Sequence, residues 1–100
     1  YSSYQLGAPG SIAAILTAAP GPSVKLWDAV IAENWNVARD LHEKLMPLCD
    51  AILIDNMPSL CKYAQKLQGL ESGFARRPTA PATNEQKEKV EVALKTLNLI

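Results

Sequence analysis

One short apolar run near the start of the chain constrains its fold more than any other feature. Residues 6–16 read LGAPGSIAAIL, where the glycines and the proline indicate a turn and residues 12–16 carry no polar side chain. A strand that is apolar on both faces is typical of a parallel sheet covered by helices. The sequence therefore predicts a buried strand at residues 12–16. A lead-in to a helix is the alternative.

No second strand is evident in the sequence, so the predicted strand has no partner within the chain. Strands pair through their backbone groups, and an unpaired buried group costs about 1–3 kcal/mol. We therefore expect the chain to be a piece of a larger protein that supplies the neighbouring strands, and we do not expect it to fold alone as a native monomer. A trimmed small domain with a disordered start is the alternative.

The composition limits the classes of function. The 100 residues fit one domain, and 48% hydrophobic with 20% charged residues is typical of globular proteins. The formal net charge of zero gives no reason to expect a nucleic-acid or membrane partner. No apolar run reaches the roughly 18 residues of a membrane helix, and no signal peptide is recognisable. We therefore expect a cytoplasmic protein.

The cysteines and the histidine give no sign of a metal or redox site. Cys49 and Cys61 fall in apolar helical patterns, which favours buried thiols over a disulfide. Their spacing matches no metal motif, and His42 is the only histidine. The sequence therefore predicts no metal and no cofactor.

Hydrophobic spacing predicts four helices after the strand. The first begins near Pro22 or Ser23, because proline suits a first helical turn and serine caps one. Its apolar face is predicted to comprise Val24, Trp27, Val30 and Ile31. Before the strand, residues 1–7 read as the last turn of a helix that Gly7 stops.

The second predicted helix has the clearest pattern in the chain. Its apolar positions recur every three or four residues, at Val37, Ala38, Leu41, Leu45, Leu48, Cys49 and Ile52. Asn34 or Asn36 is the candidate cap. Pro47 lies inside the run and is expected to bend the helix or remove one hydrogen bond, at a cost of about 3 kcal/mol.

The remaining chain is predicted to form two helices and a crossing segment. One helix opens at Pro58 and closes at Gly69, and residues 70–82, which contain two prolines, lack regular structure. Thr83 and Gln86 have the spacing of a capping box. The final helix carries its apolar residues at Val90, Ala93, Leu94 and Leu97 and ends at Asn98.

In their order, these segments resemble the C-terminal third of the dihydrodipicolinate synthase / N-acetylneuraminate lyase family. Residues 6–12 (LGAPGSI) are similar to the family's L-G-G-x-G-x-I, and residues 24–30 (VKLWDAV) to its eighth helix. Residues 36–48 (NVARDLHEKLMPL) resemble A-R-x-L-x-x-x-L-x-P-L, and residues 57–64 resemble the run N-P-x-P-V-K. The resemblance covers nearly all of the chain.

The resemblance implies a (β/α)8 TIM barrel with a three-helix C-terminal extension. The chain itself is then mostly α. Residues 1–33 would form the end of the barrel, as strand 8 and helix 8, and residues 34–100 the C-terminal helical extension. The implied activity is that of a class I aldolase or lyase, which forms a Schiff base with pyruvate or another 2-oxo acid. The implied partners are the remainder of the barrel and further subunits, commonly in a homotetramer.

Within the family, the Schiff-base lysine and a proton-relaying tyrosine lie upstream of this chain, so no catalytic residue is expected in it. Ile12 matches an isoleucine that contacts bound pyruvate and is the one candidate substrate-binding residue, with barrel core as its alternative role. Ala14 stands where N-acetylneuraminate lyases carry serine, and Thr17 where dihydrodipicolinate synthases often carry asparagine. Ala14 therefore argues against cleavage of sialic acid, and Thr17 against a role in lysine biosynthesis.

Three functions remain open. A sugar-acid or aromatic aldolase or hydratase leads, and a dihydrodipicolinate synthase of lysine biosynthesis is second. A stand-alone helical interaction module without catalysis is the third.

Overall fold

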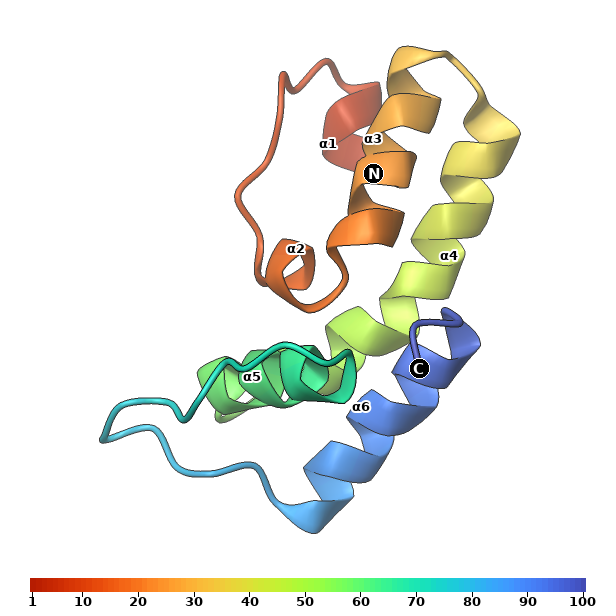
Figure 1. The fold of residues 1–100 in the computed structure, drawn as a ribbon. Coiled ribbons are helices and arrows are strands. Elements are labelled where there is room, and N and C mark those ends of the chain that lie inside the picture. Colours follow the sequence, from red (N-terminus) through yellow and green to blue (C-terminus); the bar gives the residue numbers. More distant parts are fainter.

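A computed structural model describes all of residues 1–100 and contains helices and connecting segments without any strand (Figure 1). The helices are α1 (Ser2–Gln5), α2 (Ala14–Ala18), α3 (Pro20–Ile31), α4 (Trp35–Ile52), α5 (Met57–Leu67) and α6 (Asn84–Thr96). The prediction of a mostly helical chain is confirmed. None of these helices is both long and apolar enough to cross a membrane.

The predicted strand at residues 12–16 is wrong. Ile12 and Ala13 are extended, and α2 begins at Ala14, as the alternative of a helix lead-in requires. The physical reason is that a buried strand needs a neighbour for its backbone groups, and this chain offers none. A helical turn satisfies these groups locally instead, with the N–H of Ala19 donating to the carbonyl of Ile15 at 2.8 Å. Ala18 and Ala19 are buried against the other helices.

Helix α3 begins at Pro20, shortly before the predicted start at Pro22 or Ser23, and the side that it buries overlaps the predicted one only at Val30 and the half-buried Trp27. Its buried residues are Ser23, Leu26, Ala29 and Val30. Val24 and Ile31, predicted on the apolar face, are 55% and 64% exposed. Helices α1, α2 and α4 cover α3 on the side of Leu26, so the side of Val24 and Ile31 has no neighbour.

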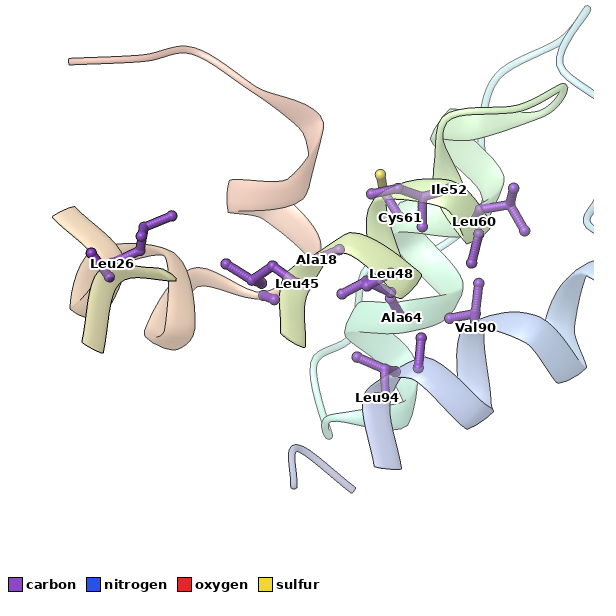
Figure 2. Close-up of a cluster of buried hydrophobic side chains, with 14 of the residues drawn as sticks. Ala18, Leu26, Leu45, Leu48, Ile52, Leu60, Cys61, Ala64, Val90 and Leu94 are labelled. Atoms are coloured by element: carbon purple, nitrogen blue, oxygen red, sulfur yellow. The ribbon is translucent and has the colours of Figure 1, made fainter. Parts of the chain in front are cut away.

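Helix α4 forms the centre of the molecule. Its cap is Asn34, whose side-chain Oδ1 accepts the backbone N–H of Val37 at 3.4 Å, and the helix continues through Pro47 to Ile52. Its buried residues face α3, α5 and α6, and Leu48 and Ile52 are completely buried. Figure 2 shows Leu48 next to Ala64 of α5, with Val90 and Leu94 of α6 in the same cluster. The second predicted helix is confirmed, apart from Val37, which is exposed.

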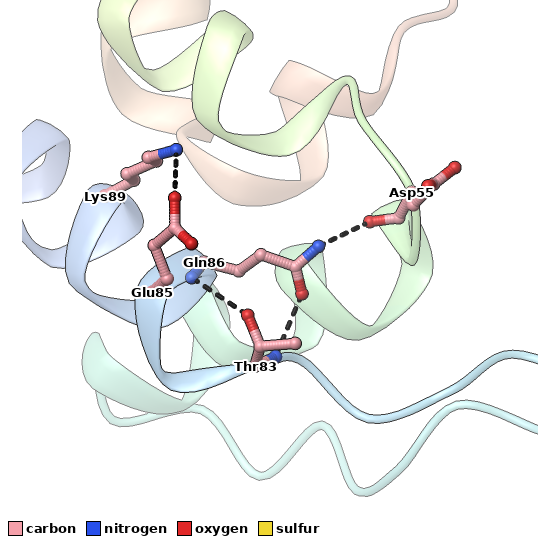
Figure 3. A network of polar contacts seen from close by, with 5 residues as sticks. All are labelled: Asp55, Thr83, Glu85, Gln86 and Lys89. Atoms are coloured by element: carbon pink, nitrogen blue, oxygen red, sulfur yellow. Dashed lines mark hydrogen bonds and ion pairs between the residues drawn. The ribbon is translucent and has the colours of Figure 1, made fainter.

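The chain beyond α5 returns to the core through the predicted irregular segment. Gly69, with a φ of +85°, ends α5, and residues 70–82 run outward and back to the start of α6 (Figure 1). The predicted capping box is confirmed. The Oγ1 of Thr83 accepts the N–H of Gln86 at 3.2 Å, and the Oε1 of Gln86 accepts the N–H of Thr83 at 2.9 Å (Figure 3).

Substitution of Thr83 by alanine should loosen the first turn of α6. The change removes the side-chain acceptor of the Gln86 N–H, and loss of such a cap costs about 1 kcal/mol. We expect the backbone amide of Gln86 to exchange with solvent about fivefold faster, measured by hydrogen exchange with nuclear magnetic resonance. Thr96→Ala is the control, because Thr96 only bonds back to the carbonyl of Val92 in the last turn of the same helix. Equal exchange rates in the two variants would contradict the role of the cap.

Candidate functional site

Ile12, the one predicted substrate-binding residue, lies in the open segment between α1 and α2. Its side chain is fully exposed, and the backbone on either side makes a wide turn away from the helices (Figure 1). The segment is fastened at Ser11, whose hydroxyl forms a hydrogen bond with the hydroxyl of Tyr4. Tyr4 in turn packs edge-on against Trp27 of α3, with ring centroids 5.0 Å apart. Ser11 is therefore held near α3 through Tyr4, whereas the side chain of Ile12 is accessible to a ligand or to another part of a larger protein.

The two positions at which the sequence departs from the family pattern lie on α2. Ala14 is half-buried, and its carbonyl oxygen is 3.9 Å from the Sγ of Cys61. Thr17 is exposed and its side chain makes no hydrogen bond. Ala14 is therefore part of the packing between α2 and α5, whereas Thr17, like Ile12, is accessible.

No lysine of the chain has the surroundings of a Schiff-base lysine. Such a lysine must be neutral often enough to attack a carbonyl, which burial in an apolar site achieves. The lysines all lie on helices, and none is buried: Lys25, Lys44, Lys62, Lys66, Lys87, Lys89 and Lys95. Lys44 and Lys89 form exposed ion pairs with Asp40 at 2.7 Å and with Glu85 at 2.8 Å.

Cys49, Cys61 and His42 also contribute to packing and do not form a reactive site. Both cysteines are free, and burial raises the pKa of the Cys61 thiol and, together with Asp50, that of Cys49. A raised pKa keeps a thiol protonated and a poor nucleophile. His42 stacks on Tyr1, with ring centroids 5.1 Å apart. No group of three or more His, Cys, Asp and Glu side chains is arranged to hold a metal ion.

One polar pair that the sequence analysis missed joins α5 to α6. The hydroxyl of Tyr63 donates a hydrogen bond to Oε1 of Glu91. Only the neutral phenol can donate this bond, so the bond, with burial and the nearby negative charge, raises the pKa of Tyr63 to about 12. The bond therefore stabilises the protein fully below pH 10, and this contribution is lost as the pH rises from about 10 to about 12.

Replacing Glu91 by glutamine should lower the pKa of Tyr63 from about 12 toward its ordinary value of 10.0, because the acceptor loses its charge. The measurement is an ultraviolet titration of the phenolate, with the titration of a Tyr63→Phe variant subtracted to remove Tyr1 and Tyr4. Glu88→Gln is the control, since Glu88 is exposed on the same helix. An unchanged Tyr63 titration in the Glu91 variant would show that the pair does not form.

The comparisons with known proteins agree with the resemblance found in the sequence. Residues 1–97 match the profile of the dihydrodipicolinate synthetase family. The 4-hydroxy-tetrahydrodipicolinate synthase of Archaeoglobus fulgidus is 36% identical over 95 residues, which are 95% of this chain and 33% of that protein. The enzymes of the same name from Syntrophus aciditrophicus and Nostoc punctiforme are also 36% identical over 95 residues, which are 33% and 32% of those proteins.

The match therefore extends over nearly the whole chain, whereas the chain spans about a third of the length of these relatives. The resemblance inferred from the sequence is confirmed. The chain belongs to the dihydrodipicolinate synthetase family.

Proposed function

We propose that this chain is the C-terminal part of a Schiff-base-forming lyase or aldolase that acts on pyruvate or a related 2-oxo acid. The observation that carries the proposal is the family match over residues 1–97 together with the coverage of about a third of each relative. Because no lysine of this chain is buried, a catalytic lysine outside it is supported. On this proposal the 100 residues alone are inactive, and the catalytic lysine and tyrosine lie upstream in a longer parent protein.

The proposed chemistry begins with attack of a neutral lysine amine on the keto carbon of pyruvate. Loss of water then leaves a protonated imine between the lysine nitrogen and that carbon. The imine withdraws electrons, so a proton or a carbon substituent can leave the adjacent carbon as the electron pair moves toward nitrogen. A tyrosine relays the protons. Cleavage, condensation and dehydration are all reached from this intermediate, so the Schiff base alone does not select among them.

A dihydrodipicolinate synthase is the specific alternative, and the names of the relatives favour it. The exposed Thr17 at the position of the family's frequent asparagine is the residue that argues against it. The alternative is tested by expressing the parent protein in a bacterial strain that lacks its own synthase. Growth without added lysine would establish that role, and absence of growth with soluble, folded protein would leave another aldolase or hydratase.

We further propose that residues 1–33 complete a (β/α)8 barrel and residues 34–100 form a helical extension on it. The uncovered side of α3 supports this placement, because Val24 and Ile31 together form an apolar surface that the other helices of the chain leave open. The rest of the barrel would cover this surface. A stand-alone helical interaction module would instead need another partner there. A cytoplasmic homo-oligomer completes the proposal.

Borohydride trapping with pyruvate tests the Schiff base. Incubation of the parent protein with pyruvate and borohydride should add one reduced pyruvate to a lysine upstream of this chain, located by mass spectrometry of the peptides. The same treatment of the 100-residue chain alone should leave its lysines unmodified. Reduced pyruvate on a lysine of α3 to α6 would overturn the assignment of these helices as scaffold.

Substitution of Ile12 by tryptophan in the parent protein tests the proposed contact with pyruvate. We expect the bulkier side chain to raise the KM for pyruvate about tenfold, which corresponds to about 1.4 kcal/mol of lost binding. Arg39→Ala and Glu43→Ala are the controls, because both residues are exposed on α4 and far in sequence from Ile12. The contact is disproved if the tryptophan variant keeps the KM of the controls.

A further inference from the structure

A small cavity lies between α5, the irregular segment of residues 70–82 and the start of α6. Its volume is about 200 Å³. Three lysines line it, Lys62 and Lys66 from α5 and Lys87 from α6, and no aspartate or glutamate does. Its apolar lining comes from Tyr63, Ala75, Pro81 and Ala82, with the 95% exposed Phe74 at the rim. Neither the Schiff-base chemistry nor the position of Ile12 involves this cavity.

Hydrogen bonds hold the irregular segment against α5 and so fix the walls of the cavity. Lys62 and Ser72 are joined twice: the Nζ of Lys62 donates to the carbonyl of Ser72, and the Oγ of Ser72 donates to the carbonyl of Lys62 at 2.8 Å. At the other end of the segment, the Oγ of Ser59 donates to the carbonyl of Ala80 at 2.7 Å. Residues 70–82 are therefore bonded to α5 near both ends of the segment, and these bonds hold the wall of the cavity in place.

The lysines of the cavity lack anionic partners in the protein. The two ion pairs of the chain involve other lysines, Lys44 and Lys89. The nearby carboxylate of Glu91 accepts the hydroxyl of Tyr63. Lys87 lies with its Nζ 5.7 Å from the centroid of the Tyr63 ring, a cation–π contact that also holds it over the cavity. The cavity is thus lined by three positively charged side chains without an ion-pair partner, and an anion placed there would be attracted by all three.

We propose that this cavity binds a phosphate monoester. Lysine ammonium groups are common phosphate ligands in proteins, and a phosphate monoester carries nearly two negative charges at neutral pH. The cavity is smaller than the roughly 300–1,000 Å³ of sites for drug-sized ligands, so the ligand is a small metabolite. The Tyr63 ring, with Phe74 and Pro81, suits the organic part of such an ester.

Isothermal titration calorimetry with phenyl phosphate tests the proposal on the purified parent protein at low ionic strength, where screening is weak. We expect saturable binding of one phenyl phosphate per chain, with weaker binding of inorganic phosphate, which lacks the apolar group. Lys66→Gln and Lys87→Gln should each raise the Kd about tenfold. Lys95→Gln is the matched control, since Lys95 is exposed on the same helix as Lys87 and does not line the cavity. Lys62 stays unchanged because it holds Ser72.

A second measurement needs no substitution. Phenyl phosphate should protect Lys66 and Lys87 from acetylation by acetic anhydride, and leave Lys95 as reactive as before, when the modified peptides are quantified by mass spectrometry. Binding of inorganic phosphate equal to that of phenyl phosphate would replace the ester by a free anion as the ligand and so overturn the proposal. Equal weakening in all three variants, or no protection of Lys66 and Lys87, would show only diffuse attraction to surface charge and would also overturn it. Neither result bears on borohydride trapping.

Discussion

Burial of one side of α4 is the interaction on which the rest of the structure depends. Helix α3 contacts neither α5 nor α6, so α4 and the short α2 are the elements that join the two halves of the molecule. Leu45, Leu48 and Ile52 of α4 supply the large buried side chains on this path. Complete burial of such a side chain contributes about 1.5–3 kcal/mol. The half of the molecule that carries Ile12 and the half that carries the lysine cavity are joined through this helix.

The sequence predicted those features whose causes lie within a few residues. Asn34 caps α4 through an amide three residues away, Thr83 and Gln86 cap α6 through each other, and Gly69 ends α5 in a left-handed conformation. Such interactions do not depend on what the rest of the chain does. The spacing of apolar residues along α4 was equally reliable, because this helix is covered on the side of its regular pattern.

The features that were not predicted depend on partners distant in sequence. The apolar residues 12–16 would form a strand only beside other strands, and in this chain they extend and then turn into α2. Likewise, Val24 and Leu26 are both apolar, and only the positions of α1, α2 and α4 decide that Leu26 is buried and Val24 exposed. Tyr63 and Glu91 meet although 28 residues separate them. The spacing of Lys62 and Lys66 was visible in the sequence, but not the segment that folds back against their helix.

The side chain of Gln86 uses both ends of its amide, and this makes the choice of amino acid at this position informative. Its oxygen accepts the N–H of Thr83 at 2.9 Å, while its nitrogen donates to the carbonyl of Asp55, in the turn between α4 and α5, at 3.2 Å (Figure 3). Glutamate serves equally well in capping boxes generally. Here, however, a glutamate at this position would place a carboxylate oxygen opposite the carbonyl oxygen of Asp55. Two acceptors cannot form a hydrogen bond, so this link between α6 and the turn after α4 would be lost. Glutamine and glutamate are therefore not interchangeable at residue 86, although a helix by itself would accept either.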